Sequence, residues 1–337
     1  MRTLISEYSC KAVLFERASD MCLKWDLYVN RLISEVVEPD IEAETRVYFD
    51  DAGSFVDFLK WLRNYNKTSQ SKVHIFGFNT LAQPHLFFWL ILGEERSQPY
   101  LRLLNDKNYM GIIDLISGDS HLQSILDTKG FDYLLFLLDE ATRTGTILEE
   151  NIDRKIDMGR RADKIIQLYL KAGDKAVIHF HTSHTNKVSD FFFDVAEKPS
   201  MGNYIYSKYG DNYFSIGFQA SEGLYIQDDS SIFSKTVTDT LQTPIPTCFE
   251  YSALKVNNPY FYYPTDKLPD GISGIRAVGR ERKSVNQFFF CSIKKRFNGL
   301  VFVCDNSQLH DIEQFPAFYT NGLMQFKDKQ QQGFLVF

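Results

Sequence analysis

The chain has 337 residues, of which 44% are hydrophobic and 24% are charged, and these proportions are ordinary for a globular protein. A net charge of −6 gives no overall attraction to nucleic acid or to an anionic membrane, so we expect neither partner. No apolar run approaches the roughly 20 residues that a membrane helix needs. The five cysteines form no CxxC pair and no signal-peptide pattern follows Met1, so the expected location is the cytoplasm.

Five short apolar runs occur along the chain, at residues 12–15, 73–76, 176–178, 213–218 and 299–303. Runs of this length between helical stretches are typical of buried strands in a largely parallel sheet. Strands that alternate with helices predict an α/β fold, with a central, largely parallel sheet flanked by helices. No repeat, low-complexity tract or Pro/Gly linker divides the chain, so we expect residues 1–337 to form one domain.

The stretch 84–145 departs from this alternation. It contains no clear strand pattern, and its apolar residues recur at helical spacing through 86–92, 100–104, 110–116 and 134–138. We therefore expect a helical insertion within the α/β domain, which would form a lid or a wall over one edge of the sheet.

Polar side chains follow the first three apolar runs. Glu16 and Arg17 come after the first run, Asn79 follows the second, and histidines follow the third. Ligands of open parallel sheets bind beyond the carboxyl ends of the strands, so these side chains are expected at one rim. Glu16 ends an almost wholly apolar strand, where a carboxylate must be paired or have a raised pKa. Capping of a helix N-terminus is the structural alternative for Glu16, and its place at a strand end favours a functional role.

His179, His181 and His184 form the densest cluster of reactive side chains. On a strand, His179 and His181 would point to the same face, and a turn at residues 182–183 would bring His184 back over the rim. Such a group can bind Zn²⁺ or another transition metal, or it can supply a base and an electrophile. His179 lies deeper in the strand, so we expect it to be packed in the sheet, and we assign function to His181 and His184.

Several well-known catalytic motifs are absent or misplaced. Gly118-Asp119-Ser120-His121 looks like the nucleophile motif of certain lipases, but it lies between helical segments, where Asp119 and Ser120 serve as a helix cap. The sequence has no G-x-S-x-G elbow, which disfavours a serine hydrolase of the usual α/β kind. It has no Walker loop and no G-x-G-x-x-G, which argues against nucleotide chemistry of those types.

The order of the segments resembles the erythromycin esterase-like family, whose members are also labelled succinoglycan biosynthesis proteins. Residues 12–16 and 26–30 resemble the family's apolar strand, its glutamate and the helix that follows, and residues 73–79 resemble its Tyr-Gly-x-Asp strand end. Residues 201–223 and 297–303 resemble a later helix and later strands, so the similarity covers most of the chain.

The histidine stretch is the most specific part of this resemblance. Residues 177–184 are similar to the family's apolar strand ending in Ala-His-Asn-x-His, which places His181 and His184 on the two family histidines. Thr182 stands where asparagine is usual.

The resemblance implies ester hydrolysis, in the best-known members of the macrolactone ring of erythromycin, without a metal or another cofactor. It implies a small-molecule ester as substrate and a water activated by a histidine among Glu, Arg and His side chains, a form of general-base assistance typically worth about 10²–10⁴-fold in rate. On this basis we expect Glu16, His181 and His184 to be catalytic. Arg17, Asn79 and Arg154, which matches a family arginine, are expected to bind substrate.

The sequence also departs from the family pattern. The family's Gly-Glu-x-x-His-Gly segment, which carries its expected general base, has no counterpart in the chain. Asn79 replaces an acidic residue, and Lys155 and Arg161 stand where Asp and Asn are common. Either the protein begins about 30–50 residues upstream, by ordinary strand–loop–helix lengths, or the chain is a degenerate relative.

Three interpretations remain open from the sequence. The chain is an esterase-type hydrolase whose base comes from an upstream segment, or a non-catalytic binding or accessory protein of the same fold. The third interpretation is a metal-dependent hydrolase that uses Glu16 with His179, His181 and His184. The sequence carries no signal for an oligomeric state.

Overall fold

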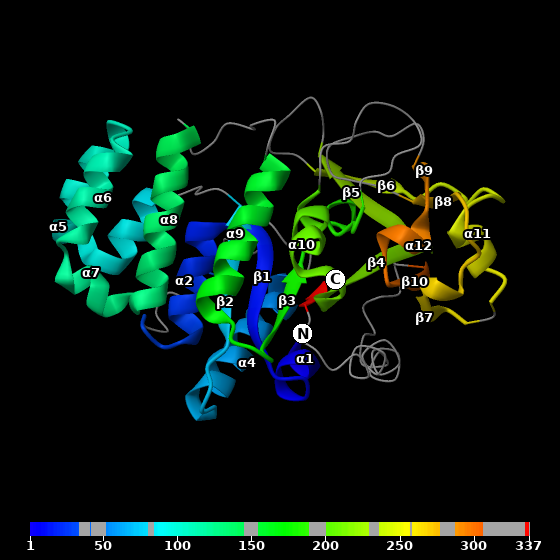
Figure 1. The fold of residues 1–337 in the computed structure, drawn as a ribbon, viewed down its shortest axis with the longest axis horizontal. Helices are drawn as coiled ribbons and strands as arrows, with labels where there is room; N and C mark the ends of the chain where they lie inside the picture. The colour runs from blue at the N-terminus through cyan, green and yellow to red at the C-terminus, as the bar shows by residue number, and fades with distance from the viewer. Residues whose placement is uncertain are drawn as a thin grey trace. The chain divides into compact units, whose positions relative to one another are not determined.

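The computed structural model describes residues 1–33, 41, 52–79, 84–144, 154–188, 200–228, 236–256, 258–276, 287–305 and 334–336. The chain divides into two compact units, Met1–His179 and Phe180–Phe337. Figure 1 shows the helices and strands of both units in chain order, coloured from blue at the N-terminus to red at the C-terminus. Helices and strands are mixed throughout, which confirms the predicted α/β class.

The sheet of the first unit is built on β1 (Cys10–Ala18), which lies between β2 (His74–Asn79) and β3 (Lys175–His179). Both neighbours run parallel to β1, with Val13 opposite Ile75 on one side and Val177 on the other. All three of these side chains are fully buried, as are their apolar neighbours in β1. Burial on both faces of a parallel sheet requires continuous apolar strands, so the three predicted strands are confirmed.

Four helices accompany this sheet, namely α1 (Arg2–Ser6), α2 (Ser19–Val29), α4 (Ala52–Thr68) and α9 (Arg154–Tyr169). Helix α2 follows β1 without a loop and packs against β1, β2 and α4. All 11 of its residues are buried, including Asp20, Lys24 and Asp26. A helix that is buried all round has no solvent face for its charges, so these must be paired within the unit.

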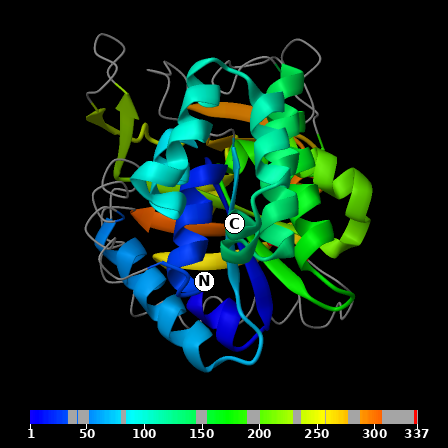
Figure 2. The same ribbon diagram turned by 90° about the vertical axis from the view of Figure 1, so that its left-hand side faces the viewer.

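Residues 84–144 contain α5 (Pro84–Asn105), α6 (Tyr109–Ser117), α7 (Ser120–Ile125) and α8 (Thr128–Thr144), and Figure 2 shows these helices grouped together toward the viewer. Helix α5 is interrupted at Gly93, whose φ of 76° lies in the left-handed region that favours glycine. The helical content expected for this stretch is confirmed, and its role as a lid stays a prediction. No helix in the described ranges is long and apolar enough to span a membrane.

The main sheet of the second unit has the strand order β11-β4-β10-β7. β4 (Tyr213–Glu222) runs parallel to both β10 (Gly299–Asp305) and β11 (Phe334–Val336), and β7 (Tyr260–Pro264) runs antiparallel to β10. The sequence predicts β4 and β10 correctly, because both are long apolar runs. It misses β7, whose residues are all half-buried and show no alternation of apolar and polar side chains.

The other described strands of the second unit form two antiparallel pairs, β5 (Leu224–Asp228) with β6 (Thr236–Thr240) and β8 (Ser273–Arg276) with β9 (Phe288–Cys291). Its helices are α10 (Met201–Tyr209), α11 (Phe249–Ala253) and α12 (Ile293–Arg296). Side chains of α11, β8 and β10 form an apolar core with Phe297, and it includes Phe249, Ile275 and Phe302.

Candidate functional site

A β-bulge in β1 places Glu16 and Arg17. Phe15 lies opposite Gly77 and Ala18 lies opposite Asn79, so β1 has one residue more than β2 over this interval. Bulges turn side chains out of the regular alternation and are enriched next to active sites. β1 continues to Ala18, so Glu16 does not end the strand as expected. Both Glu16 and Arg17 are half-buried, and Arg17 Nη1 donates to the backbone oxygen of Glu16 at 2.8 Å.

The bulge depends on a glycine in the neighbouring strand. A Cβ atom on Gly77 would lie 2.5 Å from the carbonyl oxygen of Arg17 and 2.6 Å from that of Ala18. Contacts this short to backbone atoms force a backbone shift, so only glycine lets β2 approach the bulge this closely.

The carboxyl end of β2 is held by side chains from two helices. The oxygen of Gly77 accepts hydrogen bonds from Tyr133 Oη at 2.8 Å and from Ser19 Oγ at 2.9 Å. Ser19 Oγ also lies 2.5 Å from the oxygen of Asn79, so its single proton is shared between two carbonyls. Asn79 itself is half-buried and is the last residue of β2, as expected for a side chain at the rim.

A buried ion pair flanks the same strand end. Arg161 Nε lies 2.8 Å from Glu140 Oε2, with both side chains about 95% buried or more, and Arg161 Nη1 donates to the oxygen of Phe78 at 3.3 Å. Arg161 is thus bound to an acid on α8, at a position where the resemblance leads one to expect asparagine. Glu140 is not among the residues predicted from the sequence. Its position three residues after Leu137 puts a carboxylate on the apolar face of α8, and this is the feature by which it could have been found.

His179 is the last residue of β3 and its side chain is exposed, so the expectation that it is packed in the sheet is wrong. Its ring lies 5.8 Å from the ring of Phe15, centroid to centroid. The surrounding protein desolvates the imidazolium and Arg17 repels it, and these effects outweigh Glu16 and lower the pKa of His179 to about 4. The lowered pKa keeps His179 a neutral imidazole at neutral pH.

In the second unit, His181 and His184 lie on one turn. The 3₁₀ turn Thr182–His184 is closed by a hydrogen bond from the backbone nitrogen of His184 to the oxygen of His181 at 2.8 Å. The two imidazole ring centroids are 6.0 Å apart, and the ring planes meet at 65°. His181 is exposed and His184 is half-buried. The turn thus brings together the two histidines that the sequence singles out.

The remaining predictions about the site have mixed outcomes. Arg154 is the first residue of α9, and its side chain lies outside the described residues, as does that of Lys155.

Within the described ranges, no group of three or more His, Cys, Asp or Glu side chains could hold a metal ion, so no ligand set supports the metal-dependent interpretation. The cap expected in the lipase-like motif is confirmed, because Asp119 Oδ1 accepts from the backbone nitrogens of His121 and Leu122, both at 3.0 Å.

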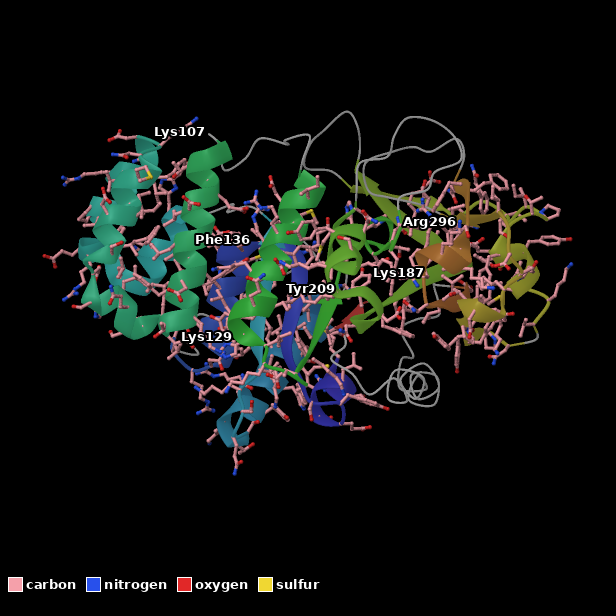
Figure 3. All side chains as sticks on the ribbon, viewed as in Figure 1. Lys107, Lys129, Phe136, Lys187, Tyr209 and Arg296 are labelled. Atoms are coloured by element: carbon pink, nitrogen blue, oxygen red, sulfur yellow. The ribbon has the colours of Figure 1, made fainter. Side chains whose placement is uncertain are left out.

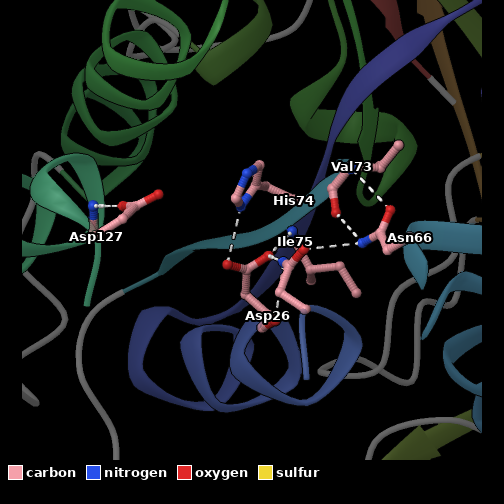
Figure 4. Close-up of polar contacts among 8 residues, drawn as sticks. Asp26, Asn66, Val73, His74, Ile75 and Asp127 are labelled. Carbon is pink, nitrogen blue, oxygen red and sulfur yellow. Dashed lines mark hydrogen bonds and ion pairs between the residues drawn. The ribbon is translucent and has the colours of Figure 1, made fainter. Parts of the chain in front are cut away.

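A second polar network lies at the amino end of β2, away from the rim (Figure 4). Asp26 Oδ1 accepts from the backbone nitrogen of Ile75 at 2.7 Å, and Asp26 Oδ2 lies 3.1 Å from His74 Nδ1. Asn66 forms two hydrogen bonds with the backbone of Val73, at 2.8 and 2.9 Å. Ligands of such sheets bind at the opposite end, so this network anchors the start of β2.

Comparison with known proteins agrees with this architecture. The sequence model described as erythromycin esterase matches residues 136–305, half of the chain. Among solved structures, a Bacillus cereus protein is 16% identical with a TM-score of 0.65, over 90% of this chain and 83% of that one. A succinoglycan biosynthesis protein is 14% identical with a TM-score of 0.61, over 90% and 82%.

An erythromycin esterase mutant in its open conformation is 16% identical with a TM-score of 0.53, over 90% of this chain and 85% of that one. At these identities the solved structures show a shared fold and no more. No curated protein sequence matches the chain. The match to the family's sequence model and the shared fold together lead to one conclusion: the chain belongs to the erythromycin esterase family.

Proposed function

We propose that the protein hydrolyses the ester bond of a small molecule, with Glu16, His181 and His184 as catalytic residues. The observation that carries this proposal is the β1 bulge, which sets Glu16 and Arg17 apart from the sheet at the strand end where ligands of such folds bind. Membership of the erythromycin esterase family supports ester hydrolysis as the reaction class. Arg17, Asn79 and Arg154 are assigned to substrate binding.

The proposed chemistry needs no cofactor. A neutral histidine takes a proton from water as the water oxygen attacks the ester carbonyl carbon, and Arg17 or Asn79 donates to the oxyanion that forms. Collapse of the tetrahedral intermediate breaks the bond to the alkoxide, which receives the proton from the histidine. The products are a carboxylic acid and an alcohol, and Glu16 stabilises the transient imidazolium.

The strand ends of the first unit support the place of Glu16 in the site. The ring of His179 lies beside that of Phe15, which directly precedes Glu16. Glu16 and His179 therefore lie at neighbouring strand ends, since β1 and β3 pair with each other.

Purified protein tested against a panel of p-nitrophenyl esters and macrolactones, with product acid followed by pH-stat, checks the proposal. We expect turnover that EDTA leaves unchanged and that Glu16→Gln lowers by about 10²-fold or more. Loss of turnover in EDTA, with recovery on adding Zn²⁺, would favour the metal-dependent alternative.

One observation favours a binding protein as the second candidate. Asn79 offers an amide where the family pattern has an acid, and an amide can hold a substrate by hydrogen bonds but cannot accept a proton as a base. No turnover of any ester in the panel, together with a thermal shift caused by one of the same macrolactones, would support this candidate over the hydrolase.

A further inference from the structure

Thr185, the residue directly after His184, has a backbone oxygen that accepts two buried side-chain hydrogen bonds. Tyr213 Oη donates to it at 2.9 Å and Ser215 Oγ donates to it at 2.8 Å. Tyr213 and Ser215 are both fully buried and are two residues apart on β4, so their side chains share one face of the strand. Burial raises the pKa of Tyr213, which keeps its hydroxyl protonated and able to donate.

The next two carbonyls are held in the same manner. Ser200 Oγ donates to the oxygen of Asn186 at 3.0 Å, and Asn203 Nδ2 donates to the oxygen of Lys187 at 2.9 Å. The backbone nitrogen of Lys187 donates to the oxygen of Arg296 at 3.0 Å, and both residues are labelled in Figure 3. Three successive carbonyls after the histidine turn are therefore fixed by side chains from β4, α10 and the residue that caps α10.

Gly202 allows α10 to pack directly against Thr185 and Tyr213. A Cβ atom on Gly202 would lie 2.5 Å from the carbonyl carbon of Thr185 and 2.6 Å from Tyr213 Oη. Helix α10 thus presses its backbone directly against the peptide that Tyr213 and Ser215 hold. The Thr185 peptide has little room to move on any of these sides.

We propose that Tyr213 and Ser215 are positioning residues that hold the His181–His184 turn in its working orientation by fixing the Thr185 carbonyl. This inference rests on the proposed function, because it presumes that the turn carries catalytic histidines. One hydrogen bond is enough to satisfy a backbone carbonyl, and a second donor on the same oxygen further restricts the orientation of that carbonyl. Thr185 also closes the turn, since its backbone nitrogen donates to the oxygen of Thr182 at 3.2 Å. Thr185 is thus fixed through both its backbone nitrogen and its carbonyl oxygen, and these contacts orient the adjacent residue, His184.

The first test compares Tyr213→Phe, Ser215→Ala and the double variant with the wild type in the ester assay. The double variant leaves the Thr185 carbonyl without a side-chain donor, and we expect its kcat to fall about 10–100-fold with KM within about twofold, because misplacing a catalytic group by about 1 Å costs up to 10²-fold. Tyr263→Phe is the matched control, since Tyr263 is a half-buried residue of β7 whose hydroxyl makes one long hydrogen bond, 3.5 Å from the oxygen of Lys267. An unchanged kcat in the double variant would overturn the inference.

A double-mutant cycle with His184→Ala separates positioning from general loss of structure. If Tyr213 and Ser215 act through His184, their replacement has no further effect on the residual rate of His184→Ala. An undiminished further loss in that background would contradict the inference.

Hydrogen exchange provides a readout that needs no substrate. In the double variant we expect the amides of His184 and Thr185 to exchange about tenfold faster, while the amides of α10 keep their wild-type rates. Unchanged exchange at the turn would overturn the inference, even where the wild type has no turnover. A wild type without turnover, combined with faster exchange at the turn, would reject the proposed function and leave the hold on the turn intact. Normal turnover in both the wild type and the double variant would reject the positioning role of Tyr213 and Ser215 and leave the proposed function intact.

Discussion

The Nε atom of Arg161 lies 2.8 Å from Oε2 of Glu140, and both side chains are almost completely removed from water. The pair ties α8 to α9, and Arg161 extends the tie to the carbonyl of Phe78 at the end of β2. Removing one partner of a buried ion pair leaves an uncompensated charge, which typically costs about 3–5 kcal/mol.

We therefore expect Glu140→Gln to lower the free energy of unfolding by about 3–5 kcal/mol in urea titrations. Lys294→Ala is the control, because its ion pair with Asp270, at 3.0 Å, joins side chains that are 36% and 92% exposed, so its loss should cost less than about 1 kcal/mol. Similar costs for the two variants would contradict the buried-pair interpretation.

Gly77→Ala should disturb the bulge that carries Glu16 and Arg17. Its new methyl group would meet two backbone oxygens at 2.5 and 2.6 Å, and overpacking of this kind typically costs about 1–3 kcal/mol. Gly118→Ala is the matched control, because its nearest neighbour would be 3.8 Å away and its φ of −95° suits alanine. Thermal unfolding of the two variants checks the difference, and equal melting temperatures would count against a required glycine.

The network at the start of β2 should make stability depend on pH. Burial alone would lower the pKa of His74, but the charge and the hydrogen bond of Asp26 outweigh burial and raise it. A pKa raised in the folded state gives a contribution that is complete below the unfolded value of about 6.5 and is lost as pH rises through the folded value. We expect Asp26→Asn to remove this loss of stability above about pH 6.5, as measured by urea titrations at several pH values. An unchanged slope in that variant would contradict the assignment to this pair.

Glu250 should contribute a second loss of stability as pH rises. Burial raises its pKa from 4.5 to about 7, although the backbone nitrogen of Arg276 donates to Oε1 at 2.7 Å. The folded state holds the proton longer than the unfolded state, so stability falls as pH rises from 4.5 toward 7, by a few kcal/mol at about 1.4 kcal/mol per pKa unit. Glu250→Gln keeps the acceptor for Arg276 and should flatten this fall. A wild-type slope in the variant would reject Glu250 as its source.

The lowered pKa of His179 can be measured by NMR titration of its ring. We expect a value of about 4 in the wild type, and an upward shift in Arg17→Gln, since that variant removes a cation that repels the imidazolium. A downward shift or no shift in Arg17→Gln would show that Arg17 does not act on His179.

The apolar strands could be read from the sequence because burial on both faces of a parallel sheet demands runs such as residues 12–15 and 299–303. The antiparallel pair β8–β9 could not, because Ser273–Arg276 is short and mixes small and charged residues, and only pairing with Phe288–Cys291 makes it a strand. Half-buried β7 was missed for a similar reason, since its four consecutive aromatic side chains are compatible with a strand, a helix or a loop.

The site was predictable to the extent that it follows from strand ends and from local spacing. Asn79 at the end of β2, and the turn that joins His181 to His184, are local features. The bulge at Glu16, the exposure of His179 and the partnership of Arg161 with Glu140 depend on how neighbouring strands and helices pack. No spacing rule within one segment reports such long-range contacts.

The central claim is that His184 takes part in ester hydrolysis, and the most direct test is the turnover of His184→Ala beside that of His121→Ala. His121 is an exposed histidine in the first turn of α7, so its replacement removes the same kind of side chain without touching the proposed site. We expect His184→Ala to lose about 10²-fold or more in kcat/KM while His121→Ala matches the wild type. Equal turnover in all three proteins would contradict it.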